Sequence, residues 1–137
     1  MYDIKDVKLK ILVKNVTNLS KFIKANLAEA IITEPFLGPQ RGLIDFKTVA
    51  RNLEELYSLA LKEFQIVLHS GGRVVMIWPM FYGQKPITPN YNGFKMLNMI
   101  PEELRSSEFI KKHYRETIIY GRPGQKVYRE IVVLEKL

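Results

Sequence analysis

A long amphipathic segment followed at once by a continuous apolar one constrains the fold more than any other feature. Between residues 48 and 70, hydrophobic residues recur at spacings of three and four, as they do along one face of a helix. Gly71 and Gly72 follow, and glycine is typical of a helix C-terminus. The next stretch, RVVMIWPMF, is apolar after its first residue, which indicates a strand buried on both faces. This order predicts a helix packed on a sheet.

The segments before this helix extend the pattern. Residues 28–33, AEAIIT, predict a short apolar strand, so residues 28–79 form a strand, loop, helix and strand, the order of one right-handed crossover unit. Residues 7–14, VKLKILVK, alternate apolar and basic side chains and predict a strand near a sheet edge with one solvated face. The spacing over residues 20–27 predicts a short helix with Ser20 as its N-cap.

The C-terminal third has a different character. Residues 82–93 contain two prolines and two glycines and predict a loop, and residues 94–100 predict a strand. Residues 101–114, which begin with proline, predict a helix. Residues 116–121 and 126–136 flank a turn sequence and predict an antiparallel hairpin. The fold class expected from these elements is a mostly parallel α/β sheet that ends in an antiparallel C-terminal hairpin.

Composition limits the classes of function. The 137 residues suit one domain, residues 1–137, and they contain no cysteine. Only His69 and His113 are available as imidazole ligands, so we expect no metal site. No apolar run approaches the length of a membrane span, and we expect a cytoplasmic protein. The balance of 21 Lys+Arg against 14 Asp+Glu gives a net charge of +7, which favours polyanionic partners such as nucleic acids. A basic protein without such a partner is the alternative.

The strongest candidate site is the turn Glu34-Pro35-Phe36, which follows the predicted strand 28–33. In open α/β sheets, ligands bind beyond the carboxyl ends of the strands. A carboxylate or a backbone carbonyl there can accept hydrogen bonds from an exocyclic amine, proline stiffens the turn, and an aromatic ring can stack on a base. The alternative is an ordinary turn with a solvated Glu34 and a core Phe36.

Other candidates are weaker. Asn15 could hydrogen-bond a ligand at the end of the first predicted strand, or it could form a turn. The KKHYR sequence at 111–115, with Arg122, Lys126 and Arg129, could form an RNA-facing basic patch or a solvated surface. The glycines of HSGGR and YGRPGQ lack the spacing of phosphate-binding loops. We find no Ser-His-Asp arrangement or paired carboxylates that would indicate a hydrolase.

The chain resembles the C-terminal half of a class I S-adenosylmethionine-dependent methyltransferase. The resemblance rests on the order of four segments: AIITEPFLGPQRG, the long helix, GGRVVMIWPMF and YGRPGQKVYREIVVLEK. The nearest group is the THUMP-linked tRNA guanine-N2 methyltransferase family. In that family a D-P-P-Y-type catalytic loop after the fourth strand holds the amine to be methylated. Here Glu34 stands at the acidic position and Pro35 at the first proline. Phe36 and Leu37 replace the usual proline and aromatic residue, and Gly38 continues the match.

The resemblance implies a partial Rossmann-like methyltransferase sheet, from its third strand onward. It implies S-adenosylmethionine as the cofactor and tRNA or another RNA as the substrate. The catalytic residues would be Glu34, Pro35 and Phe36. The cofactor-binding residues would be Asn15, Val16 and Thr33, although the family commonly has an acidic residue where Asn15 stands. The substrate-binding residues would be Leu37, Gly38, Arg122 and Lys126.

The Gly-rich loop and the acidic residue with which the family binds its cofactor are both missing from the sequence. We therefore expect strand 28–33 to have an unpaired apolar edge that another chain covers. The expected partner is a second chain that supplies the N-terminal, cofactor-binding half, or a second copy of this chain. A non-catalytic RNA-binding or scaffolding module derived from the same fold is the alternative function. A fragment of a DNA adenine or cytosine methyltransferase is a third.

Overall fold

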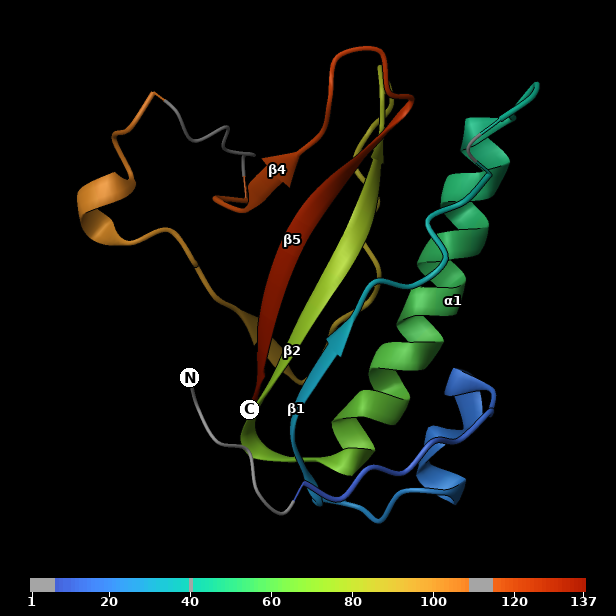
Figure 1. Ribbon diagram of the computed structural model, residues 1–137, viewed down its shortest axis with the longest axis vertical. Coiled ribbons are helices and arrows are strands. Elements are labelled where there is room, and N and C mark those ends of the chain that lie inside the picture. Colours follow the sequence, from blue (N-terminus) through green and yellow to red (C-terminus); the bar gives the residue numbers. More distant parts are fainter. Residues whose placement is uncertain (1–6, 40, 109–114) are drawn as a thin grey trace.

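The computed structural model describes residues 7–39, 41–108 and 115–137 of the chain (Figure 1). In chain order the elements are η1 (Val16–Lys21), β1 (Ala28–Thr33), α1 (Phe46–Val67), β2 (Leu68–Phe81), β3 (Phe94–Met96), η2 (Glu102–Leu104), β4 (Ile118–Tyr120) and β5 (Val127–Lys136). Here η marks a 3₁₀ helix. Figure 1 shows α1 running alongside the sheet, with η1 near its C-terminal end.

The five described strands form one mixed sheet in the order β1-β2-β5-β3, with β4 also paired to β5. β1 and β2 are parallel, and β5 runs antiparallel to β2, β3 and β4. It follows that β1 to β4 point the same way and only β5 among the described strands is reversed. The prediction of an antiparallel C-terminal hairpin is confirmed. The prediction of a mostly parallel sheet is wrong: among the described pairings only β1 with β2 is parallel, because β5 lies between strands that would otherwise be parallel neighbours.

The predicted crossover from β1 through α1 to β2 is confirmed. Asp45 caps α1, since its carboxylate accepts hydrogen bonds from the backbone N–H and the hydroxyl of Thr48. The apolar face of α1 packs on the sheet in one hydrophobic core. Its largest fully buried side chains include Trp78, Tyr57, Phe81, Leu61, Leu68 and Met76.

Helix α1 ends at Val67, earlier than the glycine pair at 71 and 72 predicted. Leu68 already has an extended backbone, with φ −73° and ψ 143°, and it pairs with Ala28 of β1. Its side chain is fully buried. Pairing with β1 and burial of Leu68 therefore favour the start of β2 over another helical turn. The two glycines fall within β2.

The strand predicted for residues 7–14 is wrong. The described residues of this segment have no regular secondary structure, and Leu9, Ile11 and Val13 are 82%, 79% and 94% exposed. An alternating pattern shows which side chains could share a face, but a strand also needs a hydrogen-bonding neighbour. Within the described part of the chain β1 pairs only with β2, so no sheet edge is joined to this segment.

Two predicted helices also differ from the structure. The helix expected over 20–27 is instead η1, which starts earlier, with Asn15 as its N-cap rather than Ser20. The helix expected over 101–114 begins only as η2, with Pro101 before its first residue, and residues 109–114 lie outside the described residues. The pair Ser106-Ser107 follows η2, and serine side chains compete for backbone hydrogen bonds in the way that favours turns.

A buried ion pair ties the C-terminal hairpin to the loop after β2. Glu130 of β5 is fully buried and accepts hydrogen bonds from Arg115 Nε at 3.0 Å, from Arg115 Nη2 and from the Thr117 hydroxyl. Arg115 also donates to the carbonyl of Ile87 at 3.1 Å and to the Thr88 hydroxyl. The ion pair therefore fixes the position of the loop that follows β2.

Candidate functional site

The loop from Glu34 to Gly38 leaves the carboxyl end of β1 beside β2 and β5. Thr33, the last residue of β1, pairs with Met76 of β2, and Arg129 of β5 pairs with Pro79 of β2. The loop therefore begins at the edge of the sheet where ligands bind in open α/β folds. This is the position predicted for the site from the sequence.

Glu34 forms an ion pair across the sheet with Arg129. Arg129 Nε donates to Glu34 Oε1 at 2.6 Å, and the side chains of Arg129 and Glu34 are 36% and 51% exposed. A carboxylate has about four acceptor sites, and this hydrogen bond uses one of them. Arg129 thus orients the Glu34 carboxylate while leaving it within reach of a ligand.

Phe36 directs its ring to solvent and its backbone carbonyl to the core. The side chain is 66% exposed, and the carbonyl oxygen accepts a hydrogen bond of 2.7 Å from the Tyr57 hydroxyl of α1. Burial raises the pKa of the Tyr57 phenol, so this hydroxyl remains a donor well above neutral pH. The alternative in which Phe36 belongs to the core does not hold, and the ring is available for stacking.

Leu37 and Gly38 anchor the loop. Leu37 is only 7% exposed and belongs to the hydrophobic core. Gly38 has φ +90°, and a Cβ built on it would lie 2.9 Å from Val49 and 3.3 Å from Phe81. Both residues therefore hold Glu34 and Phe36 in place, and their predicted binding of substrate stays a prediction.

A mostly apolar pocket of about 310 Å³ opens beside this loop. Val16, Thr33, Pro35 and Phe36, all predicted site residues, line it together with Lys14, Leu56, Tyr57, Ala60, Phe64 and Met76. Residues from η1, from the end of β1 and from α1 thus meet at one place. Lys14 is the only charged residue among those lining residues.

The described residues fit only one side of a cofactor site. Val16, Thr33 and Pro35 can form an apolar and hydroxyl-bearing wall for S-adenosylmethionine. Asn15 does not lie among the pocket residues, because its side chain accepts hydrogen bonds from the backbone N–H and the hydroxyl of Thr17, at 3.0 and 2.9 Å. Asn15 therefore forms a turn, the alternative considered for it above, and its predicted role toward a cofactor stays a prediction. Among the lining residues, Lys14 could pair with the carboxylate of the cofactor, and none carries an acidic group for its ammonium.

Arg122 and Lys126 lie in the turn between β4 and β5. The backbone carbonyl of Lys126 accepts a hydrogen bond from the N–H of Tyr82 just after β2. Lys126 lines a hollow of about 410 Å³ with Tyr82, Gly124, Gln125 and Tyr128, whereas Arg122 does not. Of the basic patch predicted around these residues, Arg115 is buried in its ion pair with Glu130, and 111–114 lie outside the described residues.

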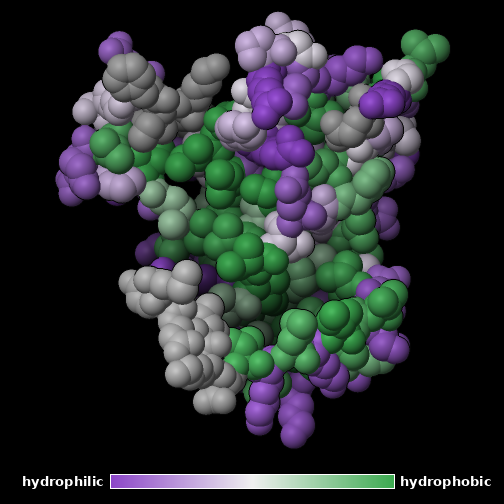
Figure 2. Space-filling view, viewed as in Figure 1, coloured by the Kyte–Doolittle hydropathy of each residue, from purple (hydrophilic) through white to green (hydrophobic). Residues whose placement is uncertain are grey.

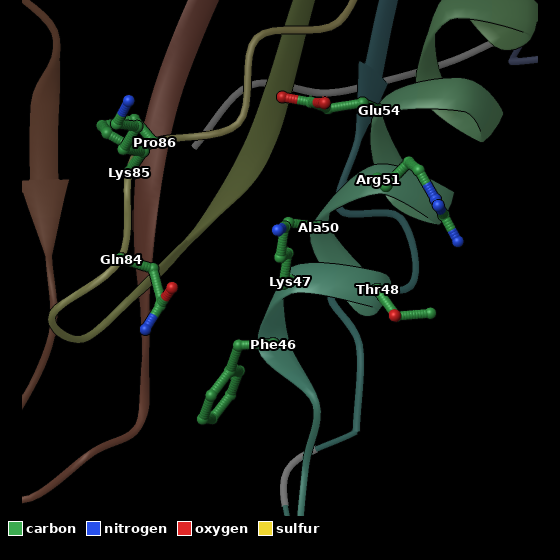
Figure 3. Close-up of a pocket in the computed structure, with 9 residues that line it drawn as sticks. All are labelled: Phe46, Lys47, Thr48, Ala50, Arg51, Glu54, Gln84, Lys85 and Pro86. Atoms are coloured by element: carbon green, nitrogen blue, oxygen red, sulfur yellow. The ribbon is translucent and has the colours of Figure 1, made fainter.

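A larger pocket, of about 700 Å³, was not predicted. It lies between the first turns of α1 and the loop after β2 (Figure 3). Its lining residues are Phe46, Lys47, Thr48, Ala50, Arg51, Glu54, Gln84, Lys85 and Pro86.

The pairing of Arg129 with Glu34 and that of Tyr57 with Phe36 were not predicted either. A glutamate at a strand end often pairs with a cation, but the sequence does not show that this cation is Arg129, which lies 95 positions away.

The described residues offer neither a metal site nor a membrane span. No group of three or more His, Asp or Glu residues there is placed to hold a metal ion. None of the helices in the described part of the chain has both the length and the apolar character needed to cross a membrane.

Comparison with known proteins identifies the fold. No family model and no curated protein matches the sequence. TrmN from Thermus thermophilus superimposes with a TM-score of 0.52 at 20% identity, over 92% of this chain and 28% of TrmN. A proposed DNA modification methylase from the same organism gives a TM-score of 0.52 at 17% identity, over 90% of this chain and 52% of the methylase. The complex of that methylase with S-adenosyl-L-methionine gives a TM-score of 0.51 at 15% identity, over 90% of this chain and 54% of the methylase.

The described structure is therefore a methyltransferase-like α/β fold, and it matches part of each of these larger proteins. The chain spans 28% of TrmN and 52% of the DNA modification methylase. At these identities the similarity concerns the fold, and function has to be argued from the site.

Proposed function

We propose that residues 1–137 form a single domain, the catalytic-loop half of a methyltransferase that acts on an exocyclic base amine in RNA. Guanine N2 of tRNA is the substrate that the sequence resemblance implies. One observation carries the proposal: a loop at the carboxyl end of β1 presents an oriented carboxylate and an exposed aromatic ring close together. The methyltransferase-like fold supports it.

In this proposal the loop binds and orients the base. Glu34 and the Pro35 carbonyl accept the hydrogen bonds of the amine, and the Phe36 ring stacks on the base. Arg129 and Tyr57 hold these groups in place. S-adenosylmethionine, when bound, supplies the methyl group. The gain in rate comes mainly from positioning. Once the methyl group has been transferred, the methylated amine loses its proton to the Glu34 carboxylate or to water, so the loop needs no strong base.

The remainder of the cofactor site belongs, in this proposal, to a segment that also covers the free edge of β1. β1 is the last strand in the order of the described sheet, so its outer edge has no partner there, and Leu27 and Ile32 beside it are 63% and 80% exposed. An unpaired edge next to exposed apolar side chains favours pairing with another strand. A second chain with the Gly-rich loop is the expected partner, and a second copy of this chain is the alternative.

The test is methyl transfer to unmodified tRNA by the chain joined with the part that completes it. Glu34→Ala should lower transfer at least about 100-fold, the scale on which one oriented hydrogen-bonding group acts in catalysis. Since the Glu34–Arg129 pair is largely exposed, the free energy of unfolding should change by no more than about 1 kcal/mol. Glu29→Ala, an exposed glutamate at the other end of β1, is the matched control. Unchanged turnover in Glu34→Ala would end the proposal.

Stacking by Phe36 can be tested on the chain alone. Guanosine monophosphate should shift the NMR signals of the Phe36 ring and of residues 33–37, and Phe36→Leu should abolish the shifts. Leu43→Ala, which changes an exposed apolar residue elsewhere, should leave them unaltered. Shifts confined to other regions would contradict a base-binding role for this loop.

The missing Gly-rich loop and the net charge of +7 also support the alternative function, an RNA-binding or scaffolding module without catalysis. Under this alternative, RNA binding is retained but Glu34→Ala has no effect on any activity. The transfer assay on the completed protein separates the two functions.

A further inference from the structure

The large pocket beside α1 carries three cationic side chains from two separate elements. Lys47 and Arg51 come from the first two turns of α1, and Lys85 comes from the loop after β2. Figure 3 shows this loop facing the helix turns, with Gln84, Lys85 and Pro86 on one side and Phe46, Ala50 and Glu54 on the other. The pocket of about 700 Å³ falls within the usual size range of ligand sites.

Two carboxylates lie near this pocket, Glu54 in its lining and Asp45 at the start of α1, and the charge of Asp45 attracts Lys47. Glu54 Oε1 accepts a hydrogen bond of 2.8 Å from the N–H of Thr88, and Asp45 caps the start of α1. The helix N-terminus therefore already has its anion. Among the described residues, no ion pair within 4.0 Å joins Lys47, Arg51 or Lys85 to a carboxylate. The lining keeps an excess of positive charge, since it has three cations and one carboxylate, Glu54. In Figure 3 Lys47 is directed toward the loop that carries Lys85, and Arg51 away from it. The two lysines, and not the helix end, therefore make the pocket a place for an external anion.

The loop wall of this pocket is held in place by its own contacts with the core and the helix. Ile87 is almost fully buried, and its carbonyl accepts hydrogen bonds from Arg115. The N–H of Asn90 donates to the Ser58 hydroxyl of α1 at 2.8 Å. With the bond from Thr88 to Glu54, these contacts fix the loop to the helix at several points. The pocket is thus preformed.

The pocket adjoins the loop proposed to hold the base. The Phe46 ring, in its wall, lies 5.1 Å from the Phe81 ring, and Gly38 packs against Phe81 and Val49. Two exposed aromatic side chains follow the carboxyl ends of β1 and β2, Phe36 at 66% and Tyr82 at 75%. Cations interspersed with exposed aromatic rings are typical of surfaces that bind single-stranded nucleic acids.

We propose that the pocket formed by Lys47, Arg51 and Lys85 binds the phosphodiester backbone of a single-stranded polynucleotide, next to the nucleotide whose base enters the loop of residues 34–38. The inference rests on the proposed function for the position of the base. The phosphates are recognised by charge, so RNA and DNA strands both meet the requirement.

The test is the salt dependence of binding of a fluorescent oligouridylate to the chain, measured by anisotropy. Replacing both lysines, Lys47→Gln with Lys85→Gln, removes two phosphate contacts. The slope of log K against log salt should fall by about 1.4, because each contact to a single strand contributes about 0.7. That change in slope corresponds to roughly 25-fold weaker binding at 0.1 M salt relative to a 1 M reference.

The matched control is Lys24→Gln with Lys62→Gln, which removes the same charge elsewhere. Lys24 precedes Asn26, which bonds to Ile66 at the far end of α1, and Lys62 lies about 22 Å along the helix from Lys47, at 1.5 Å per residue. The control should keep the slope of the parent. Equal decreases of the slope in both double variants would overturn the proposed binding site, because they would show that only the overall charge of the chain matters.

Two further binding measurements identify the kind of polyanion that the pocket binds. An oligothymidylate of the same length should show the same loss in the pocket variant, as a backbone site requires. Polyglutamate that competes as strongly as the oligonucleotide, with the same dependence on Lys47 and Lys85, would overturn a polynucleotide as the occupant. Methyl transfer in the completed protein separates the two proposals. If Glu34→Ala is inactive while the pocket variant is unaffected in binding and transfer, this inference fails and the proposed function stands.

Discussion

At the scale of single residues, the site depends on contacts between positions far apart in the sequence. Glu34 and Arg129 meet because β2 pairs with β1 on one side and with β5 on the other. The turn Glu34-Pro35-Phe36 could be predicted as a site, since its residue types and its place after an apolar strand are local features. The partner of Glu34 could not, because strand order and register decide which cation arrives there.

Tyr57 gives a prediction for stability and its pH dependence. Tyr57→Phe removes the hydrogen bond to the Phe36 carbonyl and should lower the free energy of unfolding by about 1 kcal/mol. Because burial raises the pKa of Tyr57 in the folded state, its contribution is complete below about pH 10, the ordinary tyrosine pKa, and is lost as the pH rises further. Urea unfolding over a pH series from neutral to strongly alkaline measures both effects.

The control for this change is Tyr120→Phe, at a tyrosine that is 53% exposed. It should leave the stability at neutral pH unchanged, since an exposed hydroxyl is replaced. If Tyr57→Phe showed the same alkaline decline as the parent chain, the buried phenol would not be its source.

Gly38 offers a test of the close packing under the loop. Gly38→Ala adds a Cβ 2.9 Å from Val49 at a backbone φ of +90°, whereas Gly42→Ala, at φ +88°, adds one with nothing within 4 Å. Both substitutions meet the backbone cost of positive φ, about 1 kcal/mol. The excess loss of stability in Gly38→Ala therefore measures the steric contact, and we expect it to be about a further 1 kcal/mol or more, the scale of an overpacked core. Equal losses would contradict tight packing at Gly38.

At the scale of elements, the sequence predicts best the segments whose apolar residues pack against another layer of the fold. Helix α1 and strands β1 and β2 were predictable because an amphipathic face and an apolar run each imply the layer that covers them. Their boundaries were less so: α1 ends at Val67 because Leu68 pairs with Ala28. The strand expected over 7–14 failed because its alternation needs a pairing neighbour, which the described sheet does not provide.

The buried pair Glu130–Arg115 should be the strongest tie between β5 and the loop after β2. Glu130→Gln leaves a buried arginine without its anion, so we expect a loss of about 3 kcal/mol or more in the free energy of unfolding. Amide hydrogen exchange over residues 84–88 should also become faster, because Arg115 holds the Ile87 carbonyl.

Glu135→Gln is the matched change at an exposed pair. Glu135 bonds to Arg73 at 3.3 Å with both side chains partly in solvent, and its loss should cost less than about 1 kcal/mol. Similar losses in the two variants would contradict the special role of the buried pair.

At the scale of the whole molecule, apolar side chains are exposed on one face and on β1, the last strand in the order of the described sheet. Figure 2 shows hydrophobic side chains across the middle of this face and hydrophilic ones toward the end where β4 turns into β5. Ile32 on β1 and Val13 in the segment before η1 are 80% and 94% exposed. Exposed apolar surface at a strand edge indicates an interaction site. Such a site is expected if the chain corresponds to only part of a larger fold, and the chain does cover only part of the structures that it resembles.

This surface predicts that the isolated chain associates with itself as its concentration rises. Ile32→Lys should weaken that association, because a charged side chain on an edge strand opposes pairing. Leu59→Lys, at a partly exposed leucine of α1, is the control and should not weaken it. Sedimentation velocity over a range of concentrations measures the effect. A parent chain that stays monomeric at every concentration would contradict the need for a cover on β1.

The most direct test of the account as a whole is calorimetric titration of the 137-residue chain with S-adenosylmethionine, after circular dichroism has verified its fold. In the proposed function, these residues hold the catalytic loop and one wall of the cofactor site, and the rest of the site lies elsewhere. We therefore expect no measurable heat for this chain, and saturable binding once the completing segment is added. Clear one-to-one binding by the chain alone would contradict it.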